Sequence, residues 1–538
     1  MSFVPDTQNK EFQDALNLIQ YTRQSVFLTG KAGTGKSTFL KYICANTKKK
    51  HVVLAPTGIA AINAGGSTLH SFFKLPFYPL LPDDPNFSLQ RGRIHEFFKY
   101  TKPHRKLLEE LELVIIDEIS MVRADIIDAV DRILRVYSRN LREPFGGKQI
   151  LLVGDVFQLE PVVKGDEREI LNRFYPTPYF FSARVFGQID LVSIELQKVY
   201  RQTDSKFIHV LDHIRNNTVG SAELQLLNTR YGTQIEQSEA DMYITLATRR
   251  DNVDYINDKK LAELPGDPVT FYGEIMGDFP ESSLPTSQEL VLKPGAQIIF
   301  IKNDFDRRWV NGTIGVISGF DPIEETLYVI TDDGKECDVK RESWRNIRYK
   351  YNEEKKQIEE EELGTFTQYP VRLAWAITVH KSQGLTFSRV VIDFTGGVFA
   401  GGQAYVALSR CTSLEGIQLK KPISRADVFV RPEIVSFSER FNNRTAIDRA
   451  LKQAQADVQY VAAAKAFDKG DFGTFLDEFF KAIHSRYDIE KPNVQRLIRR
   501  KLNIINRLKE ENRALKQAAL EKEKALVKSG SYTHLRAH

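Results

Sequence analysis

The segment from Gly30 to Ser37, with the letters GKAGTGKS, constrains the fold more than any other feature of the chain. It matches the pattern GxxxxGK[ST], with a short apolar run at 25–29 before it and a predicted helix at about 36–45 after it. In such a loop, backbone N–H groups turn towards phosphate oxygens, and the next helix directs its positive N-terminal end at them. Because the strand and helix supply the required context, a chance glycine turn is a poor explanation. The chain is therefore predicted to bind a nucleoside triphosphate.

The loop also assigns chemistry to two of its side chains. Lys36 is expected to reach the β- and γ-phosphates, and Ser37 is expected to hold Mg²⁺. The nucleotide and Mg²⁺ are therefore the expected cofactors. The residues expected to contact the nucleotide here are Gly30, Ala32, Gly33, Thr34, Gly35, Lys36, Ser37 and Thr38.

Two adjacent carboxylates follow a second apolar run, Leu113 to Ile116. Open parallel sheets bind ligands beyond the carboxyl ends of their strands, where Asp117 and Glu118 would stand. Asp117 suits the metal ion, and Glu118 suits a base that orients or deprotonates the attacking water. A solvated acidic pair at a strand end is the plainer alternative. Four preceding apolar residues and the upstream phosphate loop favour hydrolysis over passive binding.

Polar residues farther along the chain extend the predicted site. Gln158 follows the apolar run at 149–153 and is expected to donate to the γ-phosphate. Arg201 and Arg410 stand where a second α/β block could insert them across the nucleotide. An arginine that neutralises transition-state charge raises the rate by about 10³–10⁵. A surface ion pair is the alternative for each arginine, but the nearby segment HKSQG at 380–384 makes it a poor one.

Short apolar runs alternate with predicted helices in two blocks of the chain. Such runs indicate parallel sheets covered by helices on both faces, so the fold class is α/β. The expected strands are 25–29, 51–55, 113–116 and 149–153 in the first block, and 242–247, 297–301, 373–377 and 389–394 in the second. Between about Arg308 and Pro370, alternating runs predict a small inserted β-barrel. Beyond about Arg431 the sequence is expected to be helical.

Composition excludes other classes of protein. The chain has three cysteines, Cys44, Cys337 and Cys411, which are too few and too scattered for a disulfide framework or a CxxC metal site. No run of about 18 apolar residues could span a bilayer, and the polar first letters, MSFVPDTQNKEF, do not resemble a signal peptide. The net charge of +5 permits a local phosphate-binding groove without proving one. We therefore expect an intracellular protein with no membrane partner.

From Lys36 to Arg410 the chain resembles the Pif-type (petite integration frequency) helicases of superfamily 1B, bacterial members in particular. The likeness includes the segment from Glu118 to Asp155, which resembles the family's own signature. Val156 and Glu160 stand where the family often has Phe and Pro, and neither change removes a chemical group. The resemblance implies two RecA-like P-loop domains in tandem, an inserted Src-homology-3-like β-barrel and a helical C-terminal region. The implied boundaries are 1–190 for the first domain with a small strand-splitting subdomain at about 66–110, 191–307 and 371–430 for the second domain, 308–370 for the barrel and 431–538 for the helical region.

The resemblance also implies roles for individual residues. Gln8 resembles the glutamine that reads adenine and so gives a preference for ATP, and Arg201 and Arg410 resemble the two γ-phosphate-sensing arginines. Gly384 is expected beside the nucleotide. The expected DNA contacts are Pro56, Thr57, Gly58, His70 and Phe72 from the first domain and Thr378, His380, Lys381 and Ser382 from the second. With Phe72, the nearby Phe73, Phe77 and Tyr78 are candidates for stacking on bases, although clustered phenylalanines more often form a core.

The implied function is an ATP-dependent DNA helicase that moves 5′ to 3′ on single-stranded DNA. Its expected substrates are forks, G-quadruplexes and RNA–DNA hybrids in the bacterial cytoplasm, beside the nucleoid; a nuclear or mitochondrial location stays open. Two alternatives remain: a RecD-like motor subunit of a nuclease complex, and a nucleotide-switched single-strand clamp. The free protein is expected to be a monomer, with a DNA-dependent dimer left open. Near-heptad spacing at 494–515 allows a short coiled coil, but favours an amphipathic helix packed on the motor.

Overall fold

The computed structural model describes most of the chain, and it divides into two units, Met1–Leu451 and Lys452–His538. The described residues are 6–76, 78–84, 94–163, 165–202, 204–233, 242–306, 308–352, 354–355, 357–486 and 492–528. No helix among these residues combines the length and the apolar character needed to cross a membrane.

A six-stranded parallel sheet, here called the first sheet, holds the N-terminal third of the chain. Its strand order is β3-β2-β4-β5-β1-β6. The four strands predicted for this block are confirmed, and the sheet adds β3 and β6. The strands are β1 (Val26–Gly30), β2 (His51–Ala55), β3 (Ser67–Thr68), β4 (Leu113–Ile116), β5 (Gln149–Val153) and β6 (Val192–Leu196).

Both faces of the first sheet are buried, which explains its continuous apolar runs. Successive side chains of a strand point to opposite faces. Phe27 of β1 therefore enters one hydrophobic core, whereas its neighbours Val26 and Leu28 enter another on the opposite face. The helices of this part are α1 (Lys10–Tyr21), α2 (Lys36–Asn46), α3 (Gly58–Ala64), α4 (Leu69–Phe73), α5 (Ile94–Phe97), α6 (Lys102–Glu110), α7 (Ala124–Tyr137) and α8 (Gly165–Leu171).

A four-stranded parallel sheet, the second sheet, follows with the order β18-β7-β19-β20. Helices α9 and α12 contribute Phe207 and Val406 to the core against it. The strands are β7 (Ile244–Ala247), β18 (Ala376–Thr378), β19 (Val390–Asp393) and β20 (Ile417–Leu419). The helices are α9 (Ser205–Arg215), α10 (Ser221–Asn228), α11 (Arg250–Glu263) and α12 (Gln403–Leu408).

For two of the strands predicted in the second block, the predicted membership of the second sheet is wrong in whole or in part. The run at 297–301 forms β11 (Gln297–Phe300), which pairs antiparallel with its neighbours instead of joining the second sheet. The run at 373–377 divides between β17 (Val371–Leu373), which pairs with β11, and β18. The reason is physical: four fully buried residues look the same in sequence whether their partners run parallel or antiparallel.

Antiparallel strands lie between the elements of the second sheet, and they extend beyond the expected range of 308–370. One sheet has the order β14-β13-β12-β11-β17, and another has the order β15-β16-β9. The strands not yet given are β8 (Val269–Tyr272), β9 (Glu274–Gly277), β10 (Glu289–Leu292), β12 (Ile314–Asp321), β13 (Thr326–Thr331), β14 (Glu336–Val339), β15 (Glu342–Asn352) and β16 (Gln357–Gln368).

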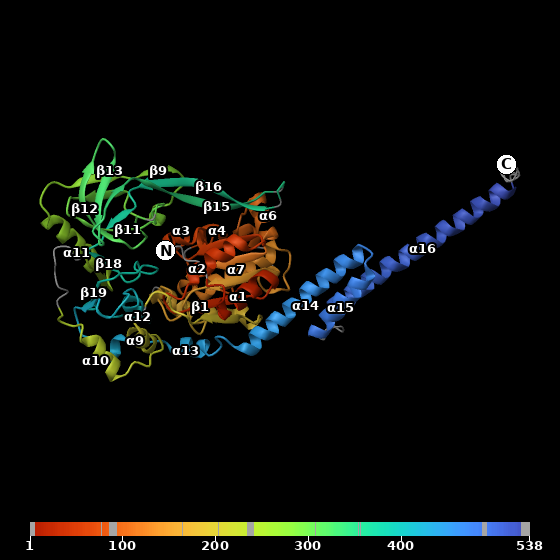
Figure 1. Cartoon of the computed structure of the whole chain (residues 1–538), viewed down its shortest axis with the longest axis horizontal. Coiled ribbons are helices and arrows are strands. Elements are labelled where there is room, and N and C mark those ends of the chain that lie inside the picture. Colours follow the sequence, from red (N-terminus) through yellow and green to blue (C-terminus); the bar gives the residue numbers. More distant parts are fainter. Residues whose placement is uncertain are drawn as a thin grey trace. The chain divides into compact units, whose positions relative to one another are not determined.

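The long hairpin of β15 and β16 reaches from these strands to the first sheet. Figure 1 shows it running towards α6, with which β15 is in contact. Ile347 and Tyr349 of β15 belong to the same hydrophobic core as Phe27 and Val52. The Tyr349 hydroxyl accepts a hydrogen bond from the Val53 amide at 3.3 Å. The antiparallel region is therefore anchored to both sheets.

The C-terminal part of the described chain is helical. Its helices are α13 (Pro432–Ser438), α14 (Arg444–Asp468), α15 (Phe472–Arg486) and α16 (Pro492–Lys528). In the second unit, Tyr460 of α14 and Phe479 of α15 pack edge to face with ring centroids 5.8 Å apart. The predicted segment 494–515 lies within α16, and its packing on the motor stays a prediction.

Candidate nucleotide site and the cleft beside it

The phosphate loop lies between β1 and α2, as its sequence predicts. Gly33 and Gly35 have φ angles of +81° and +90°, a left-handed conformation that glycine adopts without strain. The Lys36 ammonium donates to the carbonyl oxygens of Gly30 at 2.6 Å and Lys31 at 3.0 Å. Burial lowers the pKa of Lys36, and the nearby Asp155 and Glu118 carboxylates oppose that shift. The loop is therefore folded around its own lysine, with the ammonium held inside it.

Asp117 and Glu118 stand at the carboxyl end of β4, beside the loop. The Asp117 amide donates to the Leu54 carbonyl at 2.8 Å, and the Glu118 amide donates to Asp117 Oδ1 at 2.9 Å. Glu118 has φ of +49°, which turns the chain sharply at this position. Burial raises the pKa of Glu118 to about 7, and the Asp117 charge raises it further while Lys36 opposes it. Burial also raises the pKa of Asp117.

The segment that follows β6 covers the phosphate loop. The Tyr200 amide donates to the Gly33 carbonyl at 2.8 Å. A Cβ at position 33 would lie 2.4 Å from Arg201 Cβ, so only glycine allows this approach. Tyr200 also links the loop to the start of the chain, since its hydroxyl donates to Asp6 at 2.9 Å. Gln8 is exposed, and its backbone N–H donates to the same Asp6 carboxylate at 3.3 Å.

Helices α9 and α12, which pack against the second sheet, reach the same loop. Lys31 forms an ion pair with Asp212 of α9 at 2.6 Å. The Ala32 amide donates to the hydroxyl of Tyr405 in α12 at 2.9 Å. Gly402, which precedes α12, lies so close to the first sheet that a Cβ there would be 2.3 Å from the Gln158 carbonyl oxygen. The two parallel sheets therefore meet at the phosphate loop.

Arg201 lies near Lys36, and Arg410 lies near Glu118. Arg201 Nη1 donates to the Ser409 carbonyl at 3.3 Å, and its charge lowers the pKa of Lys36. Arg410 is 2% exposed and donates to the carbonyl oxygens of Val406 at 2.9 Å and Ser382 at 3.3 Å. Burial lowers the pKa of Arg410 to about 9, and the charge of Arg201 lowers it further. Arg410 in turn lowers the pKa of Glu118, so both guanidinium groups act electrostatically on the groups of the first sheet.

Arg215 is a buried charge of this site that the sequence analysis missed. Arg215 of α9 pairs with Asp155 at 3.1 Å and with Glu195 at 2.9 Å. Its guanidinium also lies 4.3 Å from the ring centroid of Phe157. Asp155 accepts from the Gln158 side chain at 3.4 Å. An arginine late in an amphipathic helix carries no local signal, because its acidic partner is 60 residues away in the sequence.

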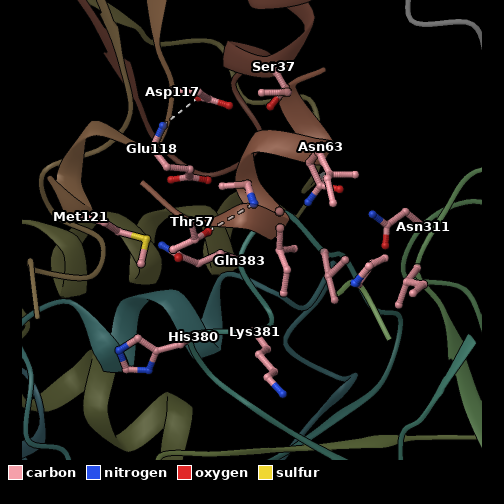
Figure 2. Close-up of a pocket in the computed structure, with 18 of the residues that line it drawn as sticks. Ser37, Thr57, Asn63, Asp117, Glu118, Met121, Asn311, His380, Lys381 and Gln383 are labelled. Carbon is pink, nitrogen blue, oxygen red and sulfur yellow. Dashed lines mark hydrogen bonds between the residues drawn. The ribbon is translucent and has the colours of Figure 1, made fainter. Parts of the chain in front are cut away.

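A cavity of about 300 Å³ opens between the two sheets next to Asp117 and Glu118. Figure 2 shows Ser37, Asp117 and Glu118 on one side of it and His380 and Lys381 on the other. Other residues that line the cavity are Thr57, Asn63, Met121, Asn311, Trp344, Arg372, Gln383 and Gly384. The predicted metal ligands and several predicted DNA contacts therefore border one space.

The predicted DNA contacts near the cavity already have structural roles. Thr57 caps α3 by accepting from the Ala60 amide at 3.2 Å, and it follows Pro56 at the end of β2. A Cβ at Gly58 would lie 2.6 Å from the Ser283 hydroxyl, so the antiparallel region covers this glycine. Thr378 accepts from the Lys381 amide at 3.2 Å. Lys381 lines the cavity, and partial burial of its ammonium and the charge of Arg372 lower its pKa.

Two predicted DNA contacts have side chains that are buried in this structure. Phe72 is 4% exposed and packs edge-on against Phe73 at 4.8 Å, so neither ring offers a face to a base. The Ser382 hydroxyl is buried and donates to the Val379 carbonyl at 2.7 Å, which closes the turn after β18. Burial lowers the pKa of His70, which is partly covered in α4. Tyr78 is 51% exposed, and Phe77 lies outside the described residues.

Comparison with known proteins places this cleft in a family. Residues 4–225 match the model of the PIF1-like helicases. The ATP-dependent DNA helicase Pif1 of Bdellovibrio bacteriovorus is 31% identical over 439 residues, which cover 80% of this chain and 91% of that protein. Human ATP-dependent DNA helicase PIF1 is 34% identical over 417 residues, which cover 74% of this chain but only 58% of the human protein.

Solved structures agree with the sequence matches. Bacteroides Pif1 in complex with ADP-AlF4 is 42% identical, with a TM-score of 0.73 and coverage of 80% of this chain and 96% of that one. The same protein bound to single-stranded DNA gives a TM-score of 0.58. The chain belongs to the PIF1-like helicase family.

Proposed function

We propose that the chain is an ATP-dependent DNA helicase whose motor is the cleft between the two parallel sheets. One observation carries the proposal: groups of the second block contact the phosphate loop of the first. Tyr405 of α12 accepts from the Ala32 amide, and Asp212 of α9 pairs with Lys31. A movement of the phosphate loop is therefore transmitted through these contacts to the helices that pack on the second sheet. Alternating closure and opening of such a cleft converts hydrolysis into movement.

The groups around the loop fit ATP hydrolysis. Lys36 would neutralise the β- and γ-phosphates, and Arg201 and Arg410 would stabilise charge on the transferred phosphoryl group. Glu118 would orient or deprotonate the attacking water, a role suited by its pKa of about 7. Gln158 would donate to the γ-phosphate, and its bond to Asp155 would report that contact to Arg215. Gln8 would contact adenine, which its proximity to Asp6 and Tyr200 supports.

Mg²⁺ fits the oxygen donors at this site. Ser37 and Asp117 border the same cavity, and hydroxyl and carboxylate oxygens are the hard ligands that Mg²⁺ takes. When bound with the nucleotide, Mg²⁺ would neutralise charge that develops on the phosphate oxygens.

We further propose that single-stranded DNA passes along the cavity side of the cleft. Thr57 and Lys381 would contact the strand from opposite sheets, with Pro56, Gly58, His70, Thr378 and His380 beside them and Gly384 towards the nucleotide. Contacts of this kind go mainly to phosphates, which makes binding largely independent of base sequence and sensitive to salt. Ser283 covers Gly58 in this structure, so the antiparallel region must move before that backbone can touch a strand. The antiparallel region at 269–373 would act as a Src-homology-3-like barrel, and α4 to α6 would carry the subdomain that splits the duplex.

The DNA substrates and partners rest on the relatives. Structures of Bacteroides Pif1 include complexes with single-stranded DNA and with forked duplex DNA bound by two coordinating helicases. Forked and tailed DNA are therefore the proposed substrates, with 5′-to-3′ movement and with a second copy on the same fork. A protein that acts on such substrates would work beside chromosomal DNA.

A strand-separation assay with the purified chain alone tests this function. We expect ATP-dependent unwinding of a duplex with a 5′ single-stranded tail, and no unwinding of a duplex with only a 3′ tail. A RecD-like subunit would require its nuclease partner, and a clamp would hydrolyse ATP without separating strands. Absence of unwinding with either tail overturns the helicase proposal, whereas unwinding from the 3′ tail alone overturns the direction.

A further inference from the structure

Two histidines and a glutamate converge on the outer side of α9 and α10. His209 and His213 are one helical turn apart in α9, so their side chains lie on the same face of the helix. Their ring centroids are 4.3 Å apart. Glu223 in the first turn of α10 completes the group, and one ligand atom from each residue lies within 4.8 Å of the others. No other group of this kind is found among the residues that the structure describes.

The surroundings hold two of these side chains in the orientation that a metal ligand needs. His213 Nδ1 lies 3.2 Å from the Thr218 carbonyl oxygen and 3.3 Å from the Thr218 hydroxyl, so this residue orients the ring. In the tautomer that donates to this carbonyl, Nε2 keeps its lone pair for a metal ion. Glu223 accepts from the Gly220 amide at 2.8 Å through one carboxylate oxygen, and this bond anchors the carboxylate at the start of α10. The site is therefore supported by backbone groups of the connecting loop.

The chemistry of the donors selects the class of ion. Two imidazole nitrogens and one carboxylate are the ligand set of open Zn²⁺ sites, in which water takes the fourth position. Mg²⁺ and Ca²⁺ prefer oxygen ligands, so a site with two nitrogens favours a transition metal. His209 is exposed and the other two residues are half-buried, which leaves the position open to an ion from solution. We propose that His209, His213 and Glu223 bind one Zn²⁺-class transition-metal ion.

The position gives such an ion a structural consequence. The neighbouring residues of the same helix, Asp212 and Arg215, pair with Lys31 of the phosphate loop and with Asp155. A metal ion bonded to both α9 and α10 would join these helices and steady α9 where it touches the nucleotide site. None of the three proposed ligands takes part in the proposed hydrolysis, so metal binding and helicase activity can be tested separately.

Calorimetric titration of Zn²⁺ into the full chain tests the proposal. The protein carries no polyhistidine tag and is first stripped with a chelator. We expect one equivalent to bind, with affinity falling at least about 10-fold in His209→Ala, His213→Ala and Glu223→Gln. Glu223→Gln keeps an oxygen acceptor for the Gly220 amide, so it removes the ligand without removing the bond that supports it.

His484→Ala is the matched control, because His484 Nδ1 also faces a backbone carbonyl, that of Phe480 at 2.7 Å, in an exposed helix. This variant should bind Zn²⁺ as the unaltered chain does. Stoichiometric binding that persists in all three ligand variants would place the ion elsewhere and overturn the proposal. Half-saturation only at about 1 mM or above would equally overturn it, since that is adventitious binding.

Two further readouts follow the ion itself. Co²⁺ in place of Zn²⁺ should give the strong visible absorption of a tetrahedral site, and His213→Ala should abolish it. Hydrogen exchange should slow at residues 205–228 when Zn²⁺ is added, and stay unchanged in the same variant. Slowed exchange without any dependence on His213 would contradict the assignment, whatever the helicase assays show.

Discussion

The two sides of the interdomain cleft differ sharply. On the side of the phosphate loop, polar contacts cross between the sheets: Lys31 with Asp212, Ala32 with Tyr405 and Asp155 with Arg215. On the other side, a cavity of about 300 Å³ separates Thr57 from Lys381. The two tasks are therefore carried out in different parts of the cleft. The sheets are joined at the backbone of the phosphate loop, and they are apart at the cavity, where Mg²⁺ and a DNA strand are expected.

Loss of the phosphate-loop lysine should produce the largest effect. In Lys36→Ala, ATP turnover and unwinding should fall to background because the β- and γ-phosphates lose their buried counter-charge. Binding of single-stranded DNA should change by less than about threefold, or 0.7 kcal/mol. Phosphate release and fluorescence anisotropy measure the two quantities. Retained turnover would show that the loop is not the catalytic site, and equal loss of DNA binding would remove the distinction between the two sides.

An arginine from the second block should come next. Arg201→Ala should lower kcat for ATP by about 10³-fold or more while KM changes much less, because the charge acts on the transition state. Steady-state hydrolysis in the presence of single-stranded DNA gives both constants. Arg250→Ala, which removes an arginine 82% exposed on its side chain, is the control and should hydrolyse ATP normally. A rise in KM with unchanged kcat would assign Arg201 to ground-state binding alone.

Loss of Arg215 should lower the stability of the fold and break the link between Gln158 and α9. Arg215→Ala leaves Asp155 buried without its partner, and the free energy of unfolding should fall by about 3–5 kcal/mol. Replacing both residues, as Arg215→Met with Asp155→Leu, should recover only part of that stability in denaturant unfolding, because Glu195 still loses its partner. Hydrolysis should stay low in the double variant, because the link from Gln158 to α9 is still missing. Full recovery of hydrolysis would reduce the pair to a structural contact.

A substitution on the cavity side of the cleft should have the smallest effect. Lys381→Ala should weaken binding of single-stranded DNA modestly and reduce the slope of log K against log salt by about 0.7, the value for one phosphate contact. Lys259→Ala, on the exposed face of α11, is the control and should leave the slope unchanged. Binding measured at several salt concentrations gives the slope. An unaltered slope in Lys381→Ala would exclude a phosphate contact at this residue.

The parts of the site that follow a strand could be predicted from the sequence. Asp117 directly follows an apolar run, Lys36 and Gln158 follow one after a short loop, and parallel strands bring their carboxyl ends to one edge. The strands of the first sheet were predictable for the same reason. At 297–301 this reasoning fails, because β11 is equally apolar but pairs antiparallel.

Contacts between distant segments explain the remaining differences. Arg215 contacts Asp155 only when the two sheets pack together, and no spacing along the sequence predicts that ion pair. Phe72 and Ser382 sit in segments that resemble DNA contacts, but the ring of one and the hydroxyl of the other are used inside the protein. A local pattern identifies a segment, whereas burial decides which of its side chains remains available.

If the cleft is the motor, the nucleotide sets the distance between the two sheets. Energy transfer between dyes on Lys48→Cys and Glu415→Cys, in a chain that also carries Cys44→Ser, measures that distance directly. Both positions are exposed, and Cys337 and Cys411 are buried. With single-stranded DNA bound, we predict a shorter distance in ADP with aluminium fluoride than in ADP alone, and no such change in Lys36→Ala. The same distance in both nucleotide states would contradict the account.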